Sequence, residues 1–184
     1  MKYSITTSLV ILAFASAGFA QKTNDAIAKQ IKSLKADKQI TLTFDGSSTK
    51  VMATAGNFDS KEASAAGIQA MNFGMAFFYP GKTLSAPPET INLTFWVLTK
   101  KPQFANAHHW TATTDKETLD LGDARYAAKR SENMEYLNFK ISRPNLTKMA
   151  AANNVKFKLG HSDFTFTPEH LSMLRKIIAI SDSH

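Results

Sequence analysis

Three residues of types that can bind metal ions lie close together in the C-terminal part of the sequence. His161 and Asp163 stand two residues apart, and His170 follows a short distance along the chain. A catalytic zinc site uses three protein ligands and leaves a fourth position open for water or substrate. The sequence therefore allows a metal-assisted site built from His161, Asp163 and His170. The simpler alternative is a turn that contains Asp163 and exposes both histidines.

The sequence His161-Ser162-Asp163 contains the residue types of a hydrolytic triad, but triad members meet in space from distant segments. His108 and His109 are neighbours in an expected strand and should point to opposite faces. Glycine-rich phosphate loops and the HExxH, GxSxG, EF-hand and CxxC motifs are missing from the sequence. We therefore expect a non-catalytic protein without a cofactor, and keep a hydrolase-like enzyme with an unrecognised site as an alternative.

Carboxylates gather between residues 115 and 135. A glycosidase needs two carboxyl groups that face each other across a cleft. Here lysines and arginines are interleaved with the acids, which favours a solvated rim of ion pairs. The acids are Asp115, Glu117, Asp120, Asp123, Glu132 and Glu135.

Aromatic residues offer a candidate ligand site. In an expected strand over residues 90–99, Trp96 shares one face with Asn92, which would place an indole beside an amide. Tyr79 ends the expected strand 68–79, and Trp110 lies in the expected strand 107–114. We predict that Trp96, Asn92, Trp110 and Tyr79 contribute to a ligand-binding site. The alternative is that these aromatic rings only pack in the core.

The pattern of apolar residues predicts an α+β fold that is predominantly antiparallel β, either sandwich-like or one curved sheet, with about eight or nine strands. An N-terminal helix, a short helix and a C-terminal helix are expected to pack against it. The expected strands are 39–45, 49–54, 68–79, 90–99, 107–114, 118–129, 134–142, 155–159 and 164–166, and the helices are 23–36, 144–153 and one that starts at Pro168.

Three of these segments carry more detailed predictions. Residues 68–79 are apolar on both faces, so this strand is expected to be covered on two sides. The strand over 118–129 should bend near Gly122. Thr167 and Pro168 are typical of the first positions of a helix, and Asn153-Asn154 should end the preceding helix in a left-handed conformation.

Residues 1–20 have the pattern of a secretory signal peptide. Lys2 precedes an apolar run from Leu9 to Phe14, and small residues lead to Ala20, after which cleavage is expected. The apolar run is too short to span the roughly 30 Å core of a bilayer. We therefore expect residues 21–184 to be a single exported globular domain with no transmembrane segment after cleavage. Its location would be periplasmic or secreted, in a bacterium.

The sequence contains no cysteine, so disulfides and thiolate metal sites are excluded. Its formal net charge is +7, but the tightest basic clusters are only pairs, which argues against a nucleic-acid groove. We expect an exported, non-catalytic binding or interaction module of the cell envelope, whose partner is a cell-envelope protein or a small ligand. A structural or assembly subunit is a further alternative.

Overall fold

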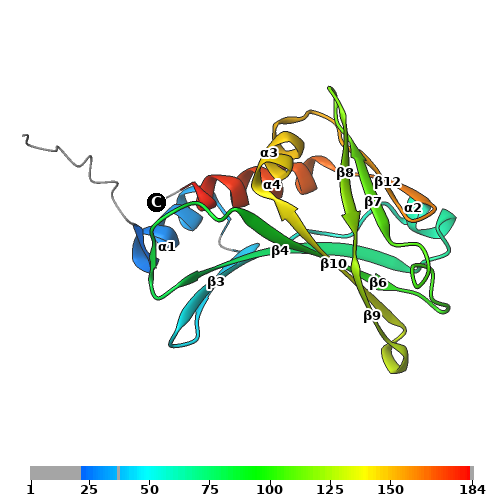
Figure 1. The fold of residues 1–184 in the computed structure, drawn as a ribbon, viewed down its shortest axis with the longest axis horizontal. Helices are drawn as coiled ribbons and strands as arrows, with labels where there is room; N and C mark the ends of the chain where they lie inside the picture. Colours follow the sequence, from blue (N-terminus) through cyan, green and yellow to red (C-terminus); the bar gives the residue numbers. More distant parts are fainter. Residues whose placement is uncertain (1–21, 37, 183–184) are drawn as a thin grey trace, which may run out of the picture.

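The computed structural model of the chain describes residues 22–36 and 38–182. The expected signal peptide over residues 1–20 lies outside the described residues. The described chain forms a six-stranded and a four-stranded antiparallel sheet, with helices packed against them (Figure 1). The predicted α+β class, with helices near both ends of the domain, is confirmed.

The six-stranded sheet is the larger of the two and has the strand order β2-β3-β4-β6-β10-β9. Neighbouring strands along the chain mostly pair with each other, and β4 and β6 are antiparallel neighbours, as predicted. The strands are β2 (Ile40–Phe44), β3 (Ser48–Thr54), β4 (Ala70–Pro80), β6 (Thr90–Leu98), β10 (Met134–Ser142) and β9 (Arg125–Lys129).

The four-stranded sheet has the order β12-β11-β7-β8, and β1 with β5 forms a separate two-stranded pair. The strands are β7 (His109–Thr113), β8 (Thr118–Asp123), β11 (Lys156–Leu159), β12 (Ser162–Thr165), β1 (Lys22–Thr23) and β5 (Thr83–Leu84). The helices are α1 (Asn24–Ser33), α2 (Ser60–Ala65), α3 (Arg143–Ala151) and α4 (Pro168–Ser181), with a short 3-10 turn over Arg130–Glu132.

The segment 118–129, expected as one bent strand, is two strands in different sheets. The bend lies where predicted, at Gly122, whose φ of +80° is readily adopted only by glycine. Beyond this point β8 ends at Asp123 and β9 begins at Arg125. The backbone N–H of Ala124 donates to the carbonyl of His108 at 3.1 Å and fixes the crossing point between the sheets.

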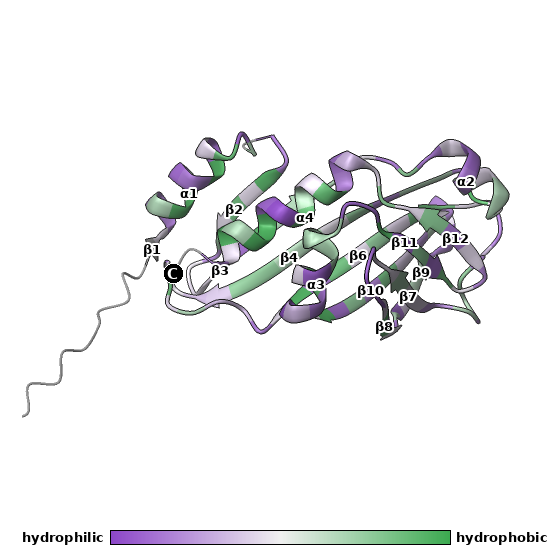
Figure 2. Ribbon diagram, turned by 90° about the horizontal axis from the view of Figure 1, so that it is seen from above, coloured by the Kyte–Doolittle hydropathy of each residue, from purple (hydrophilic) through white to green (hydrophobic). Residues whose placement is uncertain are grey.

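The helices α1, α3 and α4 lie on one side of the six-stranded sheet (Figures 1 and 2). The signals at Thr167 and Pro168 are confirmed. The Thr167 side chain accepts a hydrogen bond from the His170 N–H, and the Thr167 N–H donates to Nδ1 of His170. Leu171, Leu174 and Ile177 are buried beneath α4. No helix in the described part of the chain has the length and apolar character needed to cross a membrane.

An aromatic cluster joins the two sheets. The Phe95 ring from the six-stranded sheet lies 5.3 Å from Trp110 and 5.6 Å from Phe157, which both come from the four-stranded sheet. Phe139 closes the group, with its centroid 4.9 Å from that of Trp110. Such edge-on and offset contacts between rings stabilise a core beyond the burial of their area. The cluster fixes the position of the four-stranded sheet over one end of the larger sheet.

Two local predictions are corrected. β4 is covered on one face only, because Phe78 on its other face is 52% exposed and Ala70, Asn72 and Ala76 are only partly buried. The end of α3 is not left-handed, since its C-cap Ala152 is extended at φ −72° and ψ 152°. The N–H groups of Asn153 and Asn154 instead donate to the Asp115 carboxylate, which holds the chain after the helix.

Candidate functional site

The face of the six-stranded sheet that points away from the helices is called the outer face below. Along β6 the residues Ile91, Leu93, Phe95 and Val97 are buried, and the residues between them point outward. In Figure 1 the ends of the hairpins around β3 and β9 project on this same side, and the outer face lies between them. The register places Asn72, Trp96, Tyr136 and Ala127 side by side across it.

Trp96 is the largest partly exposed side chain at the middle of the outer face. Its indole lies over Gly74 of β4, where a Cβ atom would come 2.4 Å from Trp96 Cη2. Gly74 therefore provides the space that the ring occupies. The indole covers this glycine with one side of its ring system and keeps part of its surface accessible.

A shallow groove of about 90 Å³ runs beside Trp96. Its lining residues come from β3, β4 and β6. Lys50 stands at one side with its ammonium group 5.9 Å from the centroid of the Phe78 ring. The groove is lined by Lys50, Met52, Gly74, Met75, Ala76, Asn92, Thr94 and Trp96.

The four predicted ligand-binding residues lie on two sides of the sheet. Trp96 and Asn92 share the outer face and both line the groove. Tyr79 points into the core, where its hydroxyl donates to Asn24 Oδ1 at 2.7 Å and burial raises its pKa. Trp110 is fully buried, and its Nε1 has no hydrogen-bond partner among the described residues. The structure therefore brings together only Trp96 and Asn92.

The three residues of the hypothesised metal site do not form a ligand set. His161 is exposed at the turn between β11 and β12 and Asp163 is exposed on β12, whereas His170 is fully buried. Both ring nitrogens of His170 already have backbone partners: Nδ1 accepts from the Thr167 N–H, and Nε2 donates to the Gly56 carbonyl at 3.0 Å. Within residues 22–36 and 38–182 there is no group of three or more residues placed to hold a metal ion.

His170 is a buried polar residue that the sequence interpretation placed at the surface. Phe58 lies 4.4 Å from its ring and Phe73 lies 5.2 Å away. Burial lowers the pKa of His170, while the hydrogen bond to Gly56 and the charges of Glu169 and Glu62 oppose this shift. The ring is held in one neutral tautomer and connects α4 to the loop before α2. The signal for its burial is its spacing, because Leu174 and Ile177 follow on the same face of the helix.

Glu135 is a second titratable residue, after His170, whose burial was not predicted. It belongs to the expected rim of ion pairs, but it is only 1% exposed. Its carboxylate accepts hydrogen bonds from the N–H groups of Gln103 and Phe104 at 2.9 and 3.0 Å. Tyr126 donates a third bond at 3.0 Å. The carboxylate thereby fixes the segment after β6 to the sheet.

Tyr126 differs from an ordinary surface tyrosine because of this contact. Burial raises its pKa to about 12, with further contributions from the hydrogen bond to Glu135 and from the charge of that carboxylate, against an opposing effect of Arg130. The phenol therefore remains a hydrogen-bond donor at neutral pH. The ring of His108 stacks beside it with centroids 6.0 Å apart.

The remaining acids of the expected rim all have polar partners, but Asp115 is bound by backbone N–H groups and not by a cation. His109 lies between two of them, with Nδ1 2.9 Å from Asp123 and Nε2 3.1 Å from Asp120. Lys129 pairs with Glu132. These groups are largely exposed, and such pairs contribute little to stability.

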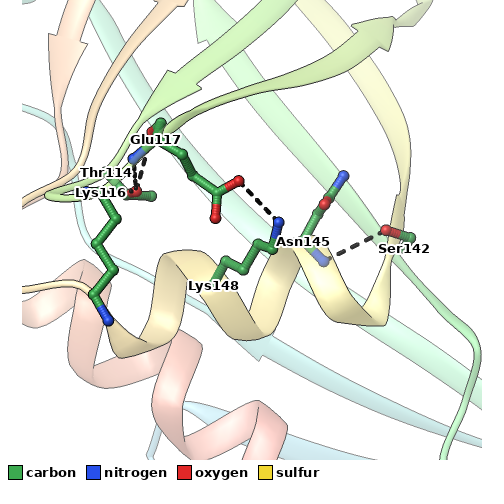
Figure 3. A network of polar contacts seen from close by, with 6 residues as sticks. All are labelled: Thr114, Lys116, Glu117, Ser142, Asn145 and Lys148. Carbon is green, nitrogen blue, oxygen red and sulfur yellow. Dashed lines mark hydrogen bonds and ion pairs between the residues drawn. The ribbon is translucent and has the colours of Figure 1, made fainter.

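A larger cleft of about 430 Å³ lies between the β7–β8 turn and α3. Figure 3 shows that its polar side chains contact one another: Glu117 accepts from Lys148 at 2.9 Å, and Thr114 Oγ1 accepts from the backbone N–H of Lys116 and of Glu117. The Asp115 carboxylate is bound by the two backbone N–H groups that follow α3. This cleft joins the turn to the helix, and its principal carboxylates are already bound.

Comparison of the chain with protein-family models, with curated proteins and with solved structures finds no match. The assignment of a function therefore rests on the site itself.

Proposed function

We propose that the chain is an exported, non-catalytic binding module that holds its ligand on the outer face of the six-stranded sheet. The observation that carries this proposal is the position of Trp96. An indole beside a groove, on a sheet face that no described helix covers, offers an apolar platform with the Asn92 amide next to it. Ligand sites combine apolar surface with a few polar groups in this way.

The contrast between the two tryptophans gives the experiment its readout. Trp110 is fully buried, so a small quencher such as acrylamide should reach Trp96 alone. We would use the protein that begins at Gln21 and measure how strongly acrylamide quenches its tryptophan fluorescence. The measurement would be made with and without each member of a panel of soluble acidic and neutral polysaccharides and solubilised peptidoglycan. A bound polymer should protect Trp96. In the variant Trp96→Phe, the polymers should leave the remaining fluorescence unchanged.

Three results would overturn the binding proposal. Protection of Trp96 that rises with protein concentration alone, together with a larger particle in light scattering, would favour an assembly subunit. Turnover of a polymer that is abolished by a single polar substitution would favour an enzyme. The absence of protection by every polymer would also reject the outer face as the binding surface.

Export is part of this proposal and has its own test. The exported fraction of cells that make the full chain should contain a protein whose first residue is Gln21, by mass spectrometry of the N-terminal peptide. Protein that keeps Met1 and stays in the cytosol would contradict it.

A further inference from the structure

We infer that the ligand on the outer face is an acidic polysaccharide, an extended sugar chain with repeated carboxylates. This inference rests on the proposed binding function and narrows its ligand class. Three features of the outer face lead to it: a charge of one sign, an aromatic platform beside an amide, and a groove too small for a compact ligand.

The outer face carries cations and no acids. The register allows its outward positions to be read strand by strand, and none of those on the six strands is Asp or Glu. Lys129 is paired with Glu132 at the edge of the sheet. The other cations are Lys50, Lys140 and Arg125, from three different strands. A surface with one sign of charge attracts ligands of the opposite sign.

The outer face of the four-stranded sheet is a useful contrast. There Lys158 of β11 pairs with Asp163 of β12 on one side and with Thr111 of β7 on the other. Thr111 in turn pairs with Asp120 of β8, so the four residues form one row across the sheet. Charges of both signs alternate on that face, as on an ordinary solvated surface. The uniform charge of the larger sheet is therefore a property of that face and does not follow from the net charge of the chain.

Trp96 and Asn92 supply the contacts that recognise a sugar. A pyranose ring presents C–H groups on its face, which pack on an indole, and hydroxyl groups at its edge, which bond to an amide. Asn138 is already bound to Thr94 and to the Arg125 carbonyl, whereas Asn92 is exposed at the groove. The aromatic and polar contacts therefore lie beside each other near Trp96.

The size and spacing of these features favour a polymer. The groove of about 90 Å³ is well below the volume that encloses a drug-sized ligand. Lys50 and Lys140 stand three strands apart in the sheet, about 14 Å at the usual spacing between strands. A long chain with recurring carboxylates meets both lysines while one of its rings lies against Trp96.

Polygalacturonate and its fully methyl-esterified form make a matched pair of probes, since they share a sugar backbone and differ in charge. We would measure their dissociation constants by the protection of Trp96 from acrylamide, with alginate and hyaluronate as further acidic polymers. At least one acidic polymer should bind at least tenfold more tightly than esterified polygalacturonate, and added salt should weaken its binding. Equal binding of esterified polygalacturonate would overturn the inference and leave the binding function standing.

Two other anions separate this ligand class from its competitors. Vesicles of phosphatidylglycerol and single-stranded DNA carry dense negative charge without uronic acid rings. Tighter binding of either than of all the acidic polysaccharides would overturn the inference. The absence of any protection of Trp96 by any polymer would reject the binding function as well, so the two failures are distinguishable.

The variant Lys50→Gln/Lys140→Gln tests the outer face directly. Each lysine removed should weaken binding of the acidic polymer about two- to fivefold, as for an exposed ion pair. Lys156→Gln/Lys158→Gln is the matched control, because it removes the same charge from exposed positions on the other sheet. Equal losses in the two double variants would mean that net charge alone attracts the polymer, and would overturn the inference.

Discussion

The backbone N–H of Phe104 donates a 3.0 Å hydrogen bond to the carboxylate of Glu135, a residue 31 positions further along the chain. Phe104 is itself buried, so this bond holds the segment after β6 on the core. A buried carboxylate needs donors, and Glu135 has them in two backbone amides and the Tyr126 hydroxyl.

Replacing Glu135 by Gln should therefore destabilise the protein. The amide keeps the shape of the side chain but turns one acceptor into a donor, which would face an N–H or O–H group. We expect a loss of about 2–3 kcal/mol in the free energy of unfolding, measured by urea denaturation. Hydrogen exchange at Gln103 and Phe104 should accelerate. The variant Glu132→Gln should keep the wild-type stability, and an equal loss there would contradict this account.

Gly74 should tolerate no larger side chain while Trp96 is present. A Cβ at this position would come 2.4 Å from Trp96 Cη2 and 3.0 Å from the carbonyl of Ala53. The variant Gly74→Ala should lose about 1–3 kcal/mol, the usual cost of overpacking. Circular dichroism in urea would measure it without relying on tryptophan fluorescence.

The same substitution in a Trp96→Phe background isolates the contact. A phenyl ring lacks the two indole atoms nearest to Gly74, so the alanine should cost less there, and the difference gives the coupling energy. If Gly74→Ala costs as much in the Trp96→Phe background as in the wild type, the backbone of Ala53 sets the limit and the indole does not.

The strands and helices of this chain were largely predictable because their signals are local. β10 has the bounds of the alternating segment 134–142, and α4 begins where Thr167 and Pro168 indicate. The assignment of strands to the two sheets was not predictable, since nothing in the alternation of residues 118–129 tells which sheet each half joins. That choice depends on the φ of Gly122 and on partners distant in sequence.

The site was predictable in part for a related reason. Alternation placed Trp96 and Asn92 on one face, but it could not tell which face the helices cover. The small residues Gly74 and Ala76 of β4 look apolar in the sequence, yet they line an open groove. Glu135 could have been found by its position, since it alternates with Leu137 and Phe139 on the buried face.

The protein should lose stability as the pH falls below the ordinary pKa of histidine, and His170 should contribute to this loss. Burial lowers the pKa of His170 in the folded state, so the unfolded chain binds a proton more readily. The contribution is fully present above about pH 6.5 and is lost as the pH falls toward the folded pKa. Glu62 and Glu169 moderate the shift, since their negative charges favour the protonated ring.

Urea unfolding at pH 7.5 and pH 5.5 measures this dependence. The variant His170→Gln should be less stable at pH 7.5 by about 1–3 kcal/mol, because a cap and a buried hydrogen bond are altered. It should also show a smaller difference between the two pH values than the wild type. The variant His161→Gln, at an exposed turn, should keep the wild-type dependence. If His170→Gln and the wild type lose the same unfolding free energy between pH 7.5 and pH 5.5, the titration belongs to another group.

Arg175 should link α4 to the end of α3. Its Nε and one terminal nitrogen each donate a 2.8 Å bond, to the carbonyls of Ala150 and Ala152. The last carbonyls of a helix have no partners within it, so the guanidinium supplies donors that they lack. The variant Arg175→Ala should lose about 1–2 kcal/mol. Lysine at this position should recover only part of this, because a single ammonium group does not match the fork of two donors. As a control, Lys148→Ala on α3 breaks only an exposed ion pair and should keep the wild-type unfolding midpoint. Full recovery of stability by Arg175→Lys would show that charge, and not the paired geometry, holds the two helices together.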